Sequence, residues 1–299
     1  MLMLGEAVRS IRERALPEGG FRSGVRGGCR GDATAWAVLA LRQAGVEPEL
    51  WQAGAARLAA AQLPDGRVPV TPQHPEAFFP TPVAVLAWQG LPDFEAASRR
   101  AVGFLLATTG KHFPKKSDDP ADHDTAIPGW PWIADTHSWV EPTALALLAL
   151  RIHRHGDHFR SREAQRLLLD RQLPGGGWNY GNTRVFGVTL QPLPDSTGVA
   201  LTALAQLVPR AQVAASLDYL QRHVSALRTP KSLGWSLLGL TAWGERPPES
   251  LPWLADCLRR QEVVPFDMES LAVLTLAFCP EGGLLPPRAA APRREGDPS

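Results

Sequence analysis

The chain has 299 residues, of which 44% are hydrophobic and 20% are charged, a profile typical of one large globular domain with an extensive core. Lys and Arg number 31 and Asp and Glu number 30, so the chain lacks the basic balance that nucleic-acid-binding proteins show. Its three cysteines are far apart and odd in number, and no run approaches the roughly 20 apolar residues that span a bilayer. We therefore expect a cytoplasmic protein with no nucleic-acid partner and no transmembrane segment, and leave contact with a membrane surface open.

Six short segments resemble one another along the chain. Each begins with Asp, Glu or Pro near a Ser or Thr and then runs into small and aliphatic residues; they lie at 32–41, 80–88, 141–150, 195–204, 230–240 and 267–276. The aligned hydroxyl residues are Thr34, Thr81, Thr143, Thr197, Ser232 and Ser270. Ala and Leu favour helices, and the runs lack the alternation of a strand. The segments predict six helices that are apolar on nearly every face and are therefore buried.

Helices of a second kind lie between these segments. They carry charge on one face and Leu or Ala on the other, and they are expected at 50–62, 94–107, 161–172 and 250–261. Inner apolar helices wrapped by outer amphipathic helices would be covered on both sides, whereas an open solenoid would leave the inner row more exposed. We predict an all-α fold, an α/α toroid of about six inner and six outer helices, with other helical bundles as the alternative. The domain should span residues 1–285, followed by a disordered tail at 286–299 that is rich in Pro and charge.

The turns that lead into the predicted inner helices share a pattern. Pro ends the outer helix, Gly supplies a positive φ, and an aromatic or aliphatic residue follows, as in ALPEGGF, AQLPDGRV and RQLPGGGW. Leu168, Gln172, Gly176 and Trp178 resemble the QW motif of squalene and oxidosqualene cyclases, and related repeats occur in the β subunits of protein prenyltransferases. The copy at 58–68 keeps the Gln but has Val68 in place of the Trp.

This resemblance to the terpenoid cyclase and protein prenyltransferase superfamily covers residues 5–280. It implies that Gln172 and Trp178 are structural, with the Gln capping a helix end and stacking on the Trp. The sequence lacks the D-x-D-D motif with which squalene cyclases protonate an alkene and the Asp-x-Cys pair with which prenyltransferases bind zinc. An enzymatic activity is therefore left open; if there is one, the resemblance implies an isoprenoid cyclase or a prenyltransferase-like enzyme.

Acidic residues mark the start of several predicted inner helices. In a toroid these helix starts converge at one end of a central cavity, which would place Asp32, Glu141, Asp195 and Asp267 at its rim. Trp36 and Trp235 would lie nearby as substrate-binding residues. Asp at a helix start is commonly an N-cap, which is the alternative interpretation. Glu is a poorer cap, so we expect Glu141 to be a buried catalytic acid, with Asp195 and Asp32 as further catalytic candidates.

The segment 111–143 is the longest departure from the repeat, and long loops on a rigid scaffold frequently carry function. Its Asp118, Asp119 and Asp122 match the D-D-x-x-D spelling of diphosphate-binding class I terpene synthases, in which the motif gathers Mg²⁺. We keep two interpretations of these residues, a Mg²⁺ site and a solvated acidic loop.

The second half of the same segment is rich in aromatic residues. Trp130, Trp132 and Trp139, together with His137, lead directly into the third predicted inner helix. We expect them to bind substrate as an aromatic lid over the cavity, because aromatic faces suit isoprenoids and stabilise carbocations. The alternative is that these tryptophans fill gaps between helices.

Three functions follow from these features. The first is a terpenoid-cyclase-like or prenyltransferase-like protein that binds or transforms an apolar isoprenoid in the central cavity. The second is a non-catalytic toroid that serves as a scaffold or partner-binding module, with a filled centre and tryptophans packed against one another. The third is a carbohydrate-active toroid with a carboxylate pair, which the presence of only two tyrosines disfavours. A protein partner cannot be named from the sequence.

Overall fold

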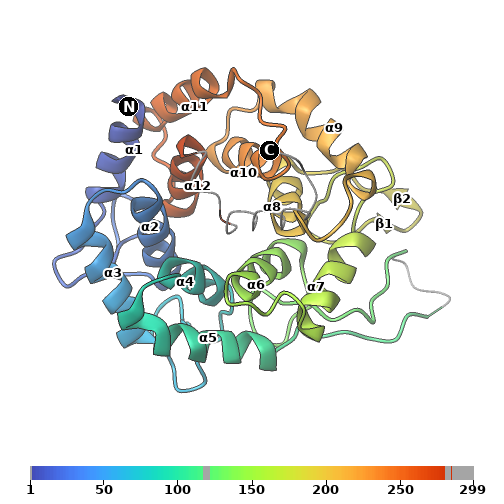
Figure 1. Ribbon diagram of the computed structural model, residues 1–299, viewed down its shortest axis with the longest axis horizontal. Helices are drawn as coiled ribbons and strands as arrows, with labels where there is room; N and C mark the ends of the chain where they lie inside the picture. The colour runs from blue at the N-terminus through green and yellow to red at the C-terminus, as the bar shows by residue number, and fades with distance from the viewer. Residues whose placement is uncertain (1, 117–121, 280–283, 285–299) are drawn as a thin grey trace, which may run out of the picture.

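A computed structural model describes residues 2–116, 122–279 and 284 of the chain. Within these residues there are twelve α-helices in two concentric rings (Figure 1). The inner ring consists of α2 (Gly31–Gln43), α4 (Pro80–Trp88), α6 (Val140–Ile152), α8 (Pro194–Leu204), α10 (Pro230–Ala242) and α12 (Met268–Phe278). The outer ring consists of α1 (Leu2–Arg12), α3 (Pro48–Ala61), α5 (Glu95–Ala107), α7 (Phe159–Asp170), α9 (Ala214–His223) and α11 (Ser250–Arg259).

The inner ring closes on itself. Each inner helix packs against the next one in the chain, and the last, α12, packs against the first, α2. A short antiparallel ribbon of β1 (Arg184–Val185) and β2 (Val188–Thr189) projects from the rim between α7 and α8 (Figure 1). The predicted α/α toroid is confirmed. The tail predicted at 286–299 lies outside the described residues.

Burial separates the two rings as the sequence pattern predicts. In α6 every residue from Val140 to Leu150 is buried, because neighbouring inner helices and outer helices cover all of its faces. Outer helix α7 buries only one side. The four outer helices expected at 50–62, 94–107, 161–172 and 250–261 differ from α3, α5, α7 and α11 by at most two residues at either end.

Four of the aligned threonines hold the turn that precedes their helix. In each case the Thr Oγ1 accepts a hydrogen bond from the backbone N–H of the residue that ends the turn; the pairs are Phe21 to Thr34 (2.9 Å), Val68 to Thr81 (3.1 Å), Trp130 to Thr143 (3.0 Å) and Trp178 to Thr197 (2.9 Å). These four donors therefore occupy one repeated position. Trp130 belongs to this repeat, although the sequence places it in the long segment 111–143, which we call the insertion.

The glutamine and glycine of the same turns join one outer helix to the next. Gln172 Nε2 donates to Ser216 Oγ in α9 at 2.7 Å. A Cβ added to Gly176 would lie 2.4 Å from the carbonyl carbon of Ala215, so the turn requires glycine at this contact. Trp178 is fully buried, and its Nε1 donates to Leu168 O at 2.6 Å. These contacts tie the end of α7 to α9. The role that the resemblance implies for Gln172 and Trp178 as a QW motif stays a prediction.

Candidate functional site

Three charged side chains from three different inner helices meet inside the ring. Lys231 of α10 donates to Glu141 of α6, with Nζ 2.8 Å from Oε1 and 3.1 Å from Oε2. The same Nζ lies 3.0 Å from Oε1 of Glu269 in α12. Because α8 stands between α6 and α10 in the ring, Lys231 and Glu141 can meet only on the inner side. We call these three residues the central charge cluster.

Burial controls the electrostatics of the central charge cluster. The side chain of Glu141 is only 5% exposed, whereas those of Lys231 and Glu269 are 26% and 31% exposed, so solvent reaches the cluster from the side of the latter two. Burial, together with repulsion from Glu269, raises the pKa of Glu141 to about 8, although Lys231 acts in the opposite direction. Burial alone would lower the pKa of Lys231, but its attraction to the two carboxylates outweighs burial and raises it above the ordinary value. Near neutral pH Glu141 is therefore largely protonated.

The raised pKa of Glu141 predicts how the free energy of unfolding depends on pH. The pKa of Glu141 is about 8 in the folded protein and about 4.3 in the unfolded chain, so the folded state binds more protons between these values. The contribution is fully present below the unfolded pKa and is lost as pH rises through the folded pKa. We expect the free energy of unfolding from urea titrations to fall between about pH 5 and pH 8, by up to about 1.4 kcal/mol per pH unit.

The Glu141→Gln variant should remove most of this slope, because its amide does not titrate. Glu95, an outer-helix residue whose side chain is 65% exposed, provides the matched control, and Glu95→Gln should keep the slope of the parent. Equal slopes in the parent and in Glu141→Gln would contradict the assignment of the proton to the central charge cluster.

A pair of tryptophans also meets inside the ring. Trp36 of α2 and Trp235 of α10 pack edge to face, with ring centroids 6.1 Å apart. Since α12 separates α2 and α10 in the ring, the two indoles can meet only on its inner side. Trp235 lies one helical turn after Lys231 and is fully buried, with no hydrogen-bond partner on Nε1 among the described residues. The structure thus brings together the two inner-helix tryptophans that the sequence singled out.

The other three acids predicted for the rim, Asp32, Asp195 and Asp267, do not join the central charge cluster. Asp32 pairs with Arg30, whose Nη2 lies 2.8 Å from Oδ2. The N-cap residues of α2 and α8 are Arg30 and Leu193, so Asp32 and Asp195 lie inside the first helical turn and do not cap it. The capping interpretation is wrong for these two residues because both helices begin earlier than the acidic residue suggests. It is correct for Asp267, whose Oδ1 accepts from Ser270 N at 2.8 Å.

The aromatic residues of the insertion are spread over three places. Trp130 is buried, with its Nε1 donating to Leu105 O of α5 at 3.0 Å and Arg160 over its ring at 4.1 Å. Trp132 packs on Phe79, the residue before α4, with ring centroids 5.6 Å apart. Trp139 precedes α6 and lines a cavity, as does His137. The structure therefore separates the three tryptophans rather than gathering them into one surface.

The acidic part of the insertion is only partly described. Asp118 and Asp119 lie outside the described residues. The carboxylate of Asp122 lies 3.4 Å from Nη1 of Arg184, a cation that would compete with a metal ion for it. Within the described part of the chain, no group of three or more His, Cys, Asp and Glu side chains is placed to hold a metal ion.

Sequence reasoning missed Lys231 and Glu269, which complete the central charge cluster. One signal was present: Lys231 occupies the first turn of an otherwise apolar helix, where the helix dipole disfavours a cation. A lysine at such a position needs nearby carboxylates. Nothing in the sequence names Glu141, which is 90 residues away, as one of them.

Comparisons with known proteins show which fold class the chain has. No family model matches the chain, and no curated protein matches its sequence. A type II terpene cyclase from Scytonema, solved with geranylgeranyl dihydroxybenzoate, is 12% identical with a TM-score of 0.62, over 95% of this chain and 97% of the other. An α-1,6-mannanase from Salegentibacter is 12% identical with a TM-score of 0.62, over 94% and 98%. A protein from Actinoplanes is 16% identical with a TM-score of 0.60, over 94% and 98%.

These likenesses establish an α/α toroid. At such identities they show the fold alone, and one toroid fold serves both terpene cyclases and mannanases. Among the described residues, no helix has both the length and the apolar character needed to cross a membrane.

Proposed function

We propose that the protein binds an apolar ligand of the isoprenoid type inside the ring, next to the central charge cluster. The observation that supports this is the pairing of Trp36 and Trp235 among inner helices that are apolar on nearly every face. Indole faces and aliphatic walls favour a hydrocarbon chain, and a few placed polar groups fix its orientation. The cluster of Glu141, Lys231 and Glu269 would hold the polar end of such a ligand.

The raised pKa of Glu141 limits the chemistry that we propose for the cluster. A carboxylic acid with a pKa of about 8 is a weaker acid than a free glutamic acid, so it is poorly suited to protonating an alkene. It is suited to hydrogen bonding and to proton exchange with oxygen or nitrogen near neutral pH. We therefore propose binding as the function, with any transformation confined to proton transfer at the polar end of the ligand. Asp32 and Asp195 are then rim residues rather than acids of the reaction.

A specific observation favours a second candidate, the non-catalytic scaffold. Two tryptophans of the inner ring, Trp36 and Trp235, pack against each other, and the inner helices are buried along nearly their whole length, as a filled centre requires. The third candidate, a carbohydrate-active enzyme, is favoured by the two carboxylates that share Lys231 and by the fold likeness to a mannanase.

Ligand binding separates the three candidates. Geranylgeraniol, squalene in detergent and α-1,6-mannotriose would each be added in thermal-shift and calorimetric titrations of the full chain. We expect geranylgeraniol to stabilise the protein, since a ligand at about 100 times its Kd adds about 2.7 kcal/mol. Mannotriose as the stabilising ligand would favour the carbohydrate candidate, and no stabilisation by any of the three would favour the scaffold.

A pair of variants tests where the ligand binds. Trp36→Leu removes an indole from the inside of the ring, and Trp253→Leu makes the same change on outer helix α11. The first should weaken geranylgeraniol binding and the second should leave it unchanged, whereas equal effects would place the ligand elsewhere.

A separate titration addresses the proposed Mg²⁺ site at Asp118, Asp119 and Asp122. Geranylgeranyl diphosphate would be titrated with and without Mg²⁺. A metal-dependent gain in affinity that Asp122→Asn removes would support the site. Identical binding curves in the presence and absence of Mg²⁺ would exclude it.

A further inference from the structure

A cavity lies beside the ring, next to the described segments 111–116 and 123–139. It has a volume of about 610 Å³ and is lined by residues of the insertion, by Arg171 at the end of α7, and by Gly181 and Asn182 in the turn before β1. The central charge cluster is not part of its lining. Its volume falls in the range of small-molecule sites, about 300–1,000 Å³. We call it the insertion cavity.

The charged side chains that line the insertion cavity are all cationic. They are Lys111, Lys116 and Arg171, accompanied by His123 and His137, and among the described lining residues there is no Asp or Glu. The cavity also adjoins the N-terminus of α6, whose dipole favours negative charge there.

The carboxylates that pair with Lys111 and Arg171 stand outside the lining. Asp135 lies 3.8 Å from Nζ of Lys111, and both side chains are more than half exposed, so this pair is weak and a ligand can displace it. Arg171 is only 5% exposed; its Nη1 donates to Asp170 Oδ2 at 2.5 Å and to Asp124 O at 3.2 Å. These bonds fix the guanidinium in place at the cavity wall.

Aromatic and aliphatic groups form the rest of the wall. Phe113 packs edge to face on His137, with ring centroids 5.6 Å apart, and Trp139 and Ile127 complete this side. A cationic pocket with a flat apolar wall matches an organic anion whose body is flat and apolar.

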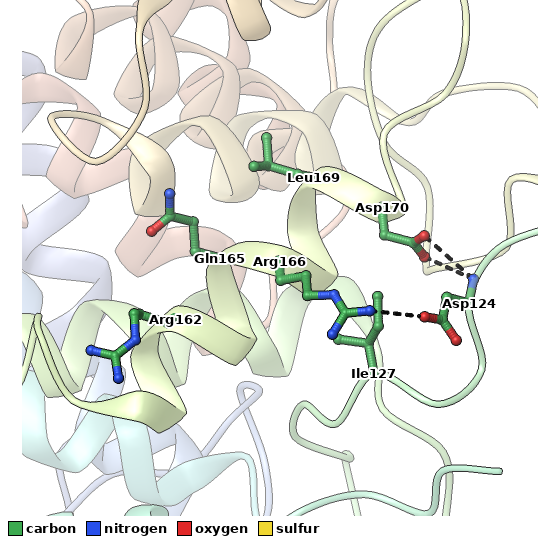
Figure 2. A pocket seen from close by; sticks show the side chains of 7 residues that line it. All are labelled: Asp124, Ile127, Arg162, Gln165, Arg166, Leu169 and Asp170. Carbon is green, nitrogen blue, oxygen red and sulfur yellow. Dashed lines mark hydrogen bonds and ion pairs between the residues drawn. The ribbon is translucent and has the colours of Figure 1, made fainter. Parts of the chain in front are cut away.

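The wall of the insertion cavity is fastened to α7. Asp124 N donates to the carboxylate of Asp170, with its nitrogen 3.1 Å from Oδ2, and Arg166 Nη2 lies 3.1 Å from Asp124 Oδ2 (Figure 2). Figure 2 also shows Ile127 beside Arg166, and Ile127 lines the insertion cavity too. The segment is thus held against a helix, which keeps the shape of the cavity defined before a ligand arrives.

We propose that the insertion cavity is a binding site for a small organic anion, an aryl or similarly flat apolar group that carries a phosphate or carboxylate. The anionic group contacts Lys111 and Arg171, and the apolar body packs on Phe113 and Trp139. This site is separate from the ring interior, so the proposal does not depend on the proposed isoprenoid binding.

Isothermal titration calorimetry with three probes tests the site: phenyl phosphate, inorganic phosphate and phenol. Phenyl phosphate should bind about tenfold more tightly than phosphate or phenol, because only it engages both the cations and the apolar wall. Lys111→Ala should weaken phenyl phosphate about tenfold. Phe113→Ala should remove the preference for phenyl phosphate over phosphate, and since the Phe113 side chain is half exposed the fold should tolerate the change.

Lys115 supplies the matched control. It belongs to the same segment and carries the same charge, but it does not line the cavity, and its Nζ donates to Asp122 O. Lys115→Ala should bind phenyl phosphate as the parent does. Equal losses of phenyl phosphate affinity in Lys111→Ala and Lys115→Ala would show that the effect comes from general surface charge. That result would overturn the proposal. The absence of saturable phenyl phosphate binding to the parent would also overturn it.

Discussion

Replacing Lys231 with Met should destabilise the protein by about 3 kcal/mol at pH 8, because two carboxyl groups then remain inside the ring without the ammonium that they share. This cost is at the lower end of the values for breaking buried ion pairs because Lys231 and Glu269 are partly exposed. Urea unfolding followed by circular dichroism measures it. The loss should shrink as the pH falls below about 8, because protonation of Glu141 relieves its repulsion from Glu269.

Two further variants test the cause of this loss. The triple variant Lys231→Met, Glu141→Gln, Glu269→Gln removes all three charges and should recover much of the lost stability, since an uncharged cluster has no unpaired charge to bury. Lys115→Met removes a lysine from the insertion and should change stability by less than about 0.5 kcal/mol. A Lys231→Met protein as stable as the parent at pH 8 would contradict the ion pairs of the central charge cluster.

The second large effect is expected at Gly198, where the backbones of two inner helices lie against each other. A Cβ added to Gly198 of α8 would lie 2.2 Å from the carbonyl oxygen and 2.3 Å from the carbonyl carbon of Trp235 in α10. Gly239 of α10 faces the same contact, since its added Cβ would lie 2.9 Å from Gly198 O. Backbone atoms cannot rotate away as side chains can, so a methyl group here must push α8 and α10 apart.

Gly198→Ala should therefore destabilise the protein by about 2 kcal/mol, the cost of overpacking exceeding the gain of up to about 1 kcal/mol in helix propensity. Gly103→Ala is the matched control, because Gly103 also lies within a helix, α5. A Cβ added there meets nothing within 4 Å, so no neighbouring backbone is pushed away. Gly103→Ala should raise stability by up to about 1 kcal/mol. Unfolding curves in urea compare the two variants, and a stabilising Gly198→Ala would show that the helices are not in backbone contact.

The Gly198 contact also bears on the proposed binding site, because it sets the spacing of the helix that carries Lys231 and Trp235. Both residues belong to α10, which packs closely on α8. A shift of α10 would displace the ammonium and the indole together. We therefore expect Gly198→Ala to weaken geranylgeraniol binding in addition to its effect on stability.

The architecture of this protein was predictable because its information is local and repeated. Helix propensity, apolar faces and turn residues are properties of short segments, so six similar helix starts were enough to predict the rings. The burial of Glu141 was also predictable, since its helix is apolar on all faces. The equivalence of Trp130 with Trp178 was not, because the insertion before Trp130 hides the repeat in the sequence.

The sequence by itself determined the α/α toroid, the inner and outer helices and the burial of Glu141. The tertiary structure alone decided that Glu141 meets Lys231 and Glu269, that Trp36 meets Trp235, and that Lys111 and Arg171 line one cavity. The physical reason is ring closure, which brings together helices from distant parts of the chain. Their partners depend on the order and spacing of whole helices, and no short segment carries that information.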